Sequence, residues 1–141
     1  MKSYQYQIIK YVHDHFTSEF VNIGVVVFDS KSQYLKCKVA RGHKRITQFF
    51  PNAEGEEVIQ LLEFFDRTIE NKSKDLTQFK ISIDDITNAI LQKDNCSIQY
   101  SDVKIGIDFD LDTALNSLYQ NMVAKYSDEN DLKSLSLQKL M

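Results

Sequence analysis

Residues 20–28 read FVNIGVVVF, and this almost unbroken run of β-branched and aromatic side chains decides the fold class. Such a run is typical of a strand that is buried on both of its faces. The polar residues 29–32 (DSKS) follow and favour a turn. Residues 34–39 (YLKCKV) alternate again, so the two segments are predicted to form a hairpin.

The segment before this hairpin also has the composition of a strand. Residues 4–12 (YQYQIIKYV) are dominated by aromatic and β-branched side chains, and apolar residues occupy both faces toward the end of the segment. This pattern favours a fairly central position in the sheet. The first third of the chain therefore predicts three consecutive strands.

Helical periodicity begins after Pro51. In residues 54–69 apolar side chains recur at intervals of three and four, which is the pattern of an amphipathic helix. A shorter helix is predicted from Ser82, whose spacing from Asp85 resembles a capping box, and residues 43–50 are predicted to be short helical or irregular. The apolar stripe of the first helix consists of Val58, Leu61, Leu62, Phe65 and Ile69.

A change of apolar parity marks the third part of the chain. Apolar side chains occupy even positions in residues 96–100 and odd positions in residues 103–111, so a turn or bulge is predicted at Ser101 and Asp102. The second run has the pattern of a half-buried strand whose odd positions face the core. Asp112 is then the expected N-cap of a last helix.

These segments predict an α+β domain in the order βββααβα. We expect an antiparallel or mixed sheet of about four to five strands packed against about three helices. The 141 residues fit one domain, which we place at residues 1–126. Residues 127–141 form a polar C-terminal tail that could be helical.

Composition excludes several classes of protein. With 43% hydrophobic and 26% charged residues, the chain is not expected to be disordered as a whole. It has no apolar run long enough to cross a membrane and no pattern of a secretory signal, which predicts a soluble cytoplasmic protein. Cys37 and Cys96 lie far apart without a CxxC motif, so neither a zinc site nor a disulfide framework is expected.

The net charge of −3 is divided unevenly along the chain. Residues 1–50 carry a net charge of +5, and the remaining residues carry −8. The densest basic stretch could bind nucleic acid through its charge and the two phenylalanines that follow it, or it could be an ordinary solvated strand and loop. The nucleic-acid candidates in this stretch are Lys36, Lys38, Arg41, Lys44 and Arg45.

Polar residues gather where a loop meets the strand at residues 20–28. Glu19 and Asn22 could contact a ligand or a protein partner, or they could hydrogen-bond the backbone where the strand begins. On extended chain their spacing directs them to opposite faces. The candidates for partner or ligand binding are Lys10, His13, Glu19, Asn22, Arg41 and Arg45.

The same stretch holds a weak candidate for a metal site. His13, His15 and Glu19 combine side chains that can ligate a metal, with His43 as a distant alternative. No HExxH motif, HxxxH motif or cysteine pair accompanies them. We therefore predict neither a metal site nor a cofactor.

Three segments together resemble a known family. They are YQYQIIKYVHD at residues 4–14, EFVNIGVVVFD at 19–29 and IQYSDVKIGIDFDLDTALNSLYQNMV at 98–123. In this order they resemble the bacterial family catalogued as domain of unknown function 3037. Its members are similar to small proteins often encoded beside a HipA-type kinase-like protein, which implies a regulatory, toxin–antitoxin-like partner role.

The sequence contains no motif that identifies a reaction. It lacks a GxGxxG motif, a P-loop and any recognisable Ser/His/Asp or Cys/His arrangement, so no catalytic residue is named and enzymatic activity is not favoured. The leading prediction is a non-enzymatic protein-binding or regulatory module whose partner is a HipA-type kinase-like protein. The alternative is a nucleic-acid-binding or nucleic-acid-processing protein that uses residues 36–45.

Overall fold

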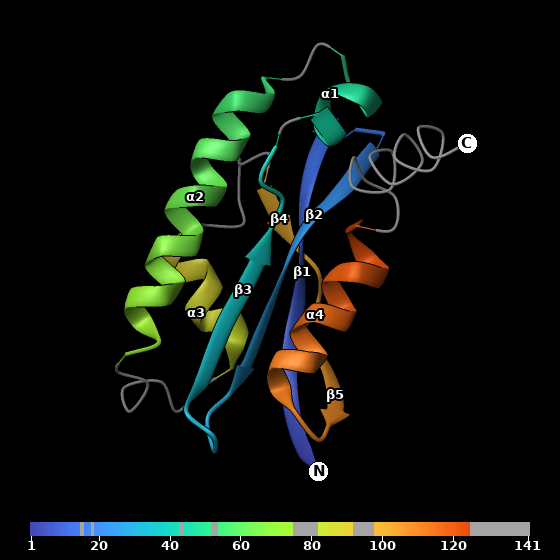
Figure 1. Ribbon diagram of the computed structural model, residues 1–141. Helices are drawn as coiled ribbons and strands as arrows, with labels where there is room; N and C mark the ends of the chain where they lie inside the picture. Colours follow the sequence, from blue (N-terminus) through green and yellow to red (C-terminus); the bar gives the residue numbers. More distant parts are fainter. Residues whose placement is uncertain are drawn as a thin grey trace, which may run out of the picture.

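The run at residues 20–28 forms most of the second strand of a five-stranded antiparallel sheet in the computed structural model (Figure 1). The structure describes residues 1–14, 16–17, 19–42, 44–51, 54–74, 82–91 and 98–124. The elements in chain order are β1 (Lys2–Asp14), β2 (Glu19–Asp29), β3 (Tyr34–Val39), α1 (Lys44–Phe49), α2 (Gly55–Lys72), α3 (Ile83–Ile90), β4 (Ile98–Tyr100), β5 (Lys104–Asp108) and α4 (Leu111–Met122).

The α+β class is confirmed, with one helix more than expected. The sheet order is β3-β2-β1-β4, and β5 also pairs with β1. The predicted hairpin of β2 and β3 is present, since Val26 lies opposite Cys37 and Phe28 lies opposite Leu35. The predicted tail at residues 127–141 lies outside the described residues.

Strands β4 and β5 lie end to end along the same side of β1. β4 pairs with residues 9–11 and β5 with residues 2–6. Between them, Ser101 binds Ile8 twice: its backbone N–H donates to the Ile8 carbonyl at 2.9 Å, and its Oγ accepts from the Ile8 N–H at 2.9 Å. The break predicted from the change of parity therefore occurs where a serine side chain replaces one backbone group in the ladder.

A register shift in β2 changes the parity of the residues that face the larger core, from Val21 and Ile23 before it to Val26 and Phe28 after it. Ile9 pairs with Gly24 and Lys10 pairs with Asn22, so Ile23 is an extra residue in the ladder. Gly24 lies at this shift, where an added Cβ would be 3.0 Å from Val39 Cγ1 and 3.2 Å from the Lys38 carbonyl oxygen. A glycine at this position therefore allows β2 and β3 to approach closely.

Helices cover the two faces of the sheet unequally. Figure 1 shows α2 and α3 on one side of the sheet and α4 on the other. The larger core lies between the sheet and α1–α3, and the smaller core lies under α4. The smaller core consists of Tyr4, Ile8, Val25, Val27, Leu111, Ala114, Leu115, Tyr119, Val123 and Ala124.

Helix α2 follows the predicted apolar stripe with one exception. Val58, Leu62, Phe65 and Ile69 are buried, but Leu61 is 36% exposed. The apolar stripe of a helix this long is narrow where it meets the sheet, because residues at its border turn toward solvent. The sheet therefore buries only the centre of the predicted stripe.

Helix α3 is attached to β1 by polar contacts. The Gln5 side chain accepts a hydrogen bond of 2.8 Å from the Ile83 N–H, at the start of α3, where Ser82 makes no side-chain cap. The predicted capping box is therefore wrong. A strand residue supplies the acceptor because α3 begins directly over β1.

Gln7 is fully buried between β1 and α3. Its Nε2 donates to Asp84 Oδ1 at 2.9 Å and to the Ser101 carbonyl oxygen at 3.2 Å. Its Oε1 accepts a hydrogen bond of 2.7 Å from Thr87 Oγ1. The buried amide thus has partners for its donor and acceptor groups, as a polar side chain in a core requires.

The last helix begins earlier than the sequence predicts. Asp110, and not Asp112, is the N-cap of α4, because its Oδ2 accepts hydrogen bonds from the Thr113 N–H at 3.1 Å and Thr113 Oγ1 at 2.7 Å. Asp112 lies in the first turn instead. Leu111 can therefore be helical and buried in the core under α4.

The predicted burial of β5 is wrong. Ile105, Ile107 and Phe109 are 71%, 62% and 76% exposed, although they form the apolar side of the strand pattern. Ile105 pairs with Gln5 and Ile107 with Ser3, so both point to the face that carries α2 and α3. Among the described residues, no helix extends far enough along this face to cover them.

Candidate functional site

The end of the β1–β2 hairpin brings together four of the residues predicted to bind a partner. Lys10 lies opposite Asn22, and Glu19 lies opposite Asp14 next to His13. We call the described residues 10–14, 16–17 and 19–22 the hairpin end. The remaining two candidates, Arg41 and Arg45, belong to the segment after β3.

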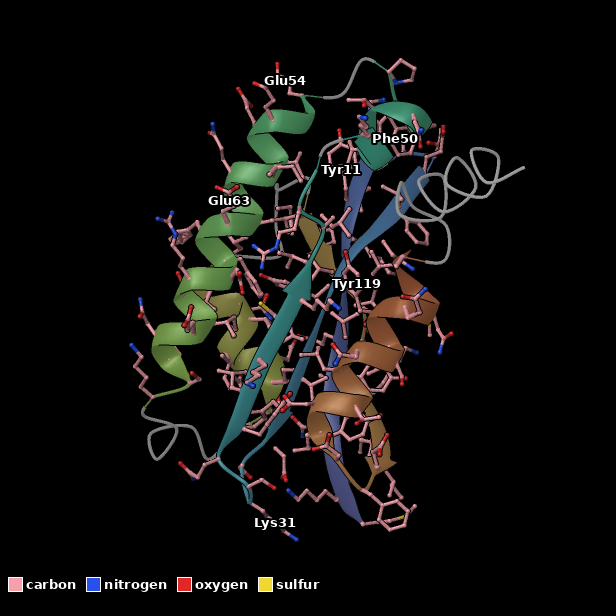
Figure 2. All side chains as sticks on the ribbon, in the orientation of Figure 1. Tyr11, Lys31, Phe50, Glu54, Glu63 and Tyr119 are labelled. Carbon is pink, nitrogen blue, oxygen red and sulfur yellow. The ribbon has the colours of Figure 1, made fainter. Side chains whose placement is uncertain are left out.

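His13 lies against α1 on one face of the hairpin end. Its ring stacks on Phe50 with centroids 4.4 Å apart and an interplanar angle of 10°, and its Nδ1 is 3.2 Å from the Tyr11 hydroxyl. Figure 2 shows Tyr11 and Phe50 side by side at this end of the sheet. The pKa of Tyr11 is raised mainly by burial of its hydroxyl, and the negative charge of Glu54 raises it further.

The opposite face of the hairpin end points toward α4. The Asn22 Nδ2 donates a hydrogen bond of 3.0 Å to the Met122 carbonyl oxygen at the end of α4. On the same face, Lys10 Nζ is 4.5 Å from the centre of the Phe20 ring, which is a cation–π distance. No local pattern in the sequence identifies Met122 as part of this site, because it lies a hundred positions from Asn22 in the chain.

Two aromatic side chains of the hairpin end face solvent. Phe16 is 97% exposed and Phe20 is 49% exposed. The prediction that the strand is buried from Phe20 onward is wrong at this first residue, because α4 ends before it reaches Phe20. The sequence signal for Phe16 is its position, because it is a large apolar side chain in the otherwise polar loop at residues 13–18.

Glu19 is exposed and accepts a hydrogen bond of 3.0 Å from Thr17 Oγ1. The weak metal candidate combines it with His13 and His15, and His15 lies outside the described residues. Within the part of the chain that the structure describes, no three His, Cys, Asp or Glu side chains gather closely enough to hold a metal ion. The hydrogen bond from Thr17 instead ties Glu19, the first residue of β2, to the turn that precedes the strand.

The basic stretch divides between the two faces of the sheet. Lys36 forms an ion pair of 3.1 Å with Asp112, and Lys38 Nζ lies 3.4 Å from Asn116 Oδ1 and 4.8 Å from the centre of the Tyr119 ring. Both lysines lie beside α4. Tyr34 also donates a hydrogen bond of 2.7 Å to Asp112.

The other part of the basic stretch lies beside α2 and α1. Arg41 forms an ion pair of 3.3 Å with Asp66, which also accepts a hydrogen bond of 3.2 Å from the Cys37 thiol. Lys44 is exposed on α1, and the Arg45 side chain is outside the described part. The structure thus does not bring Lys36 and Lys38 together with Arg41 on one face, and nucleic-acid binding by this stretch stays a prediction.

The charges around these groups shift several pKa values. The pKa of Asp112 is lowered mainly by the hydrogen bond that Tyr34 donates to it. The hydrogen bond from Lys36 lowers it further. Burial, followed by the charge of Asp66, raises the pKa of the Cys37 thiol well above its ordinary value. Cys37 is therefore a protonated, packed side chain at neutral pH.

Of the helices that the structure describes, none is long and apolar enough to cross a membrane.

Comparison with curated proteins and with solved structures gives no match. Comparison with protein families matches residues 6–123 to the family described as "Protein of unknown function (DUF3037)". This range contains every helix and strand except the first residues of β1. The chain therefore belongs to the DUF3037 family.

Proposed function

We propose that the protein is a non-enzymatic binding module that contacts a protein partner through the hairpin end. The observation that carries this proposal is the exposure of Phe16 and Phe20, at 97% and 49%. Aromatic side chains are enriched at the centres of protein interfaces and supply much of the binding energy there.

The surroundings of these two rings support the proposal. Lys10 lies over the Phe20 ring, and Glu19 is exposed next to it in the chain, so charged groups border the aromatic surface. Protein interfaces commonly combine an apolar centre with a polar rim. The contact of His13 with Phe50 and that of Asn22 with Met122 attach the hairpin end to α1 and to α4. Such attachment lowers the entropic cost of binding.

The partner that we place first is a HipA-type kinase-like protein, because the family resemblance implies one. The hairpin end would present its two aromatic side chains to a pocket of that protein. Regulation would follow from occupation of the partner's surface and not from a reaction catalysed by this chain.

Binding of a purified HipA-type kinase-like protein from the same organism, measured by isothermal titration calorimetry, tests the proposal. We expect Phe16→Ala and Phe20→Ala each to weaken binding by about tenfold or more, which is the usual effect at an interface centre. Phe64→Ala is the matched control, because Phe64 is 42% exposed on α2, away from the hairpin end. Absence of binding, or equal affinities for all variants, would contradict the proposal.

A further inference from the structure

Strand β5 has a free side. It pairs with β1 along one side, and within the described part of the chain no strand runs along the other. Figure 1 shows β5 at the margin of the sheet near the N-terminus. An edge strand with exposed apolar side chains is a template for pairing with another strand.

The backbone groups on this free side belong to Ile105 and Ile107. Ile8 directs both its N–H and its carbonyl toward Ser101, on the side of β1 that β4 and β5 share. Because backbone groups alternate sides along a strand, Tyr4 also directs its groups to this side, where it pairs with Gly106. Gly106 is therefore directed inward, and its two isoleucine neighbours direct their N–H and carbonyl groups outward.

The sequence of β5 is complementary to itself when one copy is reversed. It reads Lys-Ile-Gly-Ile-Asp, with a cation at one end, an anion at the other and Gly106 in the centre. Antiparallel pairing centred on Gly106 sets Lys104 opposite Asp108 of the second copy. The same register sets Ile105 opposite Ile107 of the second copy, so that charges and apolar groups both match.

We propose that the protein forms a symmetric dimer in which β5 pairs antiparallel with β5 of a second copy. The outward groups of Ile105 and Ile107 form the hydrogen-bonded pairs, and the two copies of Gly106 form the closer pair between them. The two sheets become one continuous sheet across a two-fold axis.

The described helices leave room for this pairing. Helix α4 packs mainly on β2 and β3 and touches β5 little, and α2 packs mainly on β3, so both helices lie mostly away from β5. Pairing would bury part of Ile105 and Ile107, which are 71% and 62% exposed in the single chain. The dimer therefore accounts for the apolar side chains that the single chain leaves in water.

Charge reversal tests the proposed register. Light scattering after size exclusion should give twice the chain mass of 16.4 kDa for the wild-type protein. Lys104→Glu and Asp108→Lys each set like charges opposite each other, so we expect each to weaken the dimer by about tenfold. The double variant restores opposite charges and should dimerise like the wild type.

Mixing the two single variants provides a sharper test. A Lys104→Glu chain and an Asp108→Lys chain have opposite charges at both ends of the paired strands, so the mixture should form a heterodimer that neither forms alone. Lys31→Glu, in the exposed turn after β2, is the control for a change of net charge. Circular dichroism melts of each single variant establish that the monomers are folded.

A proline substitution tests the backbone contribution. Ile107→Pro removes an N–H that points away from β1, so the β1–β5 ladder should persist while the dimer is lost.

A wild-type protein that remains monomeric at high concentration would overturn the proposal. A dimer that tolerates Ile107→Pro and both charge reversals would equally overturn it. Neither result bears on the hairpin end, since no substitution lies there.

Discussion

The side-chain amide of Asn22 donates a hydrogen bond of 3.0 Å to the carbonyl oxygen of Met122, which joins the beginning of β2 to the end of α4. The last carbonyls of a helix have no partner within the helix. Asn22 supplies a donor for one of them and so fixes α4 over the hairpin end.

Removal of this donor should loosen the end of α4. We expect Asn22→Ala to lower the free energy of unfolding by about 1 kcal/mol, and Asn22→Asp by more, because a carboxylate would face a carbonyl at the negative end of the helix dipole. Urea denaturation measures both effects. Asn121→Ala, at an exposed position of α4, is the control and should change stability little. Equal stability of all three variants would contradict the assigned role.

The buried amide of Gln7 should tolerate loss of its Nε2 donor poorly. Gln7→Glu places a carboxylate against Asp84 Oδ1 and the Ser101 carbonyl, where Nε2 now donates. We expect a loss of about 3 kcal/mol at neutral pH, because a buried charge would face two acceptors. Burial would raise the pKa of the new carboxyl in the folded state, so the loss should shrink as the pH falls and the group takes up a proton.

Thermal melts across pH check this prediction for Gln7. Gln60→Glu makes the same chemical change at an exposed position of α2 and should alter stability little. If both glutamate variants melted alike at neutral pH, the contacts between Gln7, Asp84 and Ser101 would not contribute to stability as proposed.

Asp112 should titrate below the ordinary range of an aspartate. Its folded-state pKa is lowered first by the Tyr34 hydrogen bond and then by Lys36. A lowered folded pKa contributes stability above the unfolded-state pKa, and this stability is lost as the pH falls through the folded-state value. NMR titration of the Asp112 carboxyl should show Tyr34→Phe raising the midpoint more than Lys36→Met. The reverse order would contradict the assignment of the larger effect to Tyr34.

The Cys37 thiol should react slowly with alkylating reagents. Burial and the adjacent Asp66 carboxylate both raise its pKa, so little thiolate is present at neutral pH. In a Cys96→Ser background, we expect the native protein to react with iodoacetamide far more slowly than the urea-unfolded protein. Asp66→Asn should speed the native reaction, because Arg41 would then act on the thiolate without an opposing charge. Equal rates for native and unfolded protein would contradict this view of Cys37.

Local patterns predicted most of the secondary structure. The hairpin at residues 20–39 and the break at Ser101 follow from alternation and from its change of parity, which depend only on neighbouring residues. The sequence predicts the N-cap of α4 two residues late, because Asp110 and Asp112 are chemically equivalent caps. Only the packing of Leu111 into the core decides between them.

Burial is harder to predict from sequence where it depends on elements that are distant in the chain. Alternation in residues 103–109 identifies an apolar side of β5 but cannot say whether a helix covers it, and Ile105 and Ile107 are exposed. Gln7 is the reverse case. It is a polar strand residue, yet it is fully buried, because α3 brings Thr87 and Asp84 into hydrogen-bonding distance.

The sequence alone determined the α+β class, the segments that form strands and helices, and the family to which the chain belongs. These properties follow from backbone preferences and periodicity over a few residues. Only the tertiary structure decided that Asn22 binds Met122, that the basic stretch divides between two faces, and that the apolar side of β5 stays exposed. Each of these depends on which element packs where, because a side chain's environment is made by residues far away in the chain.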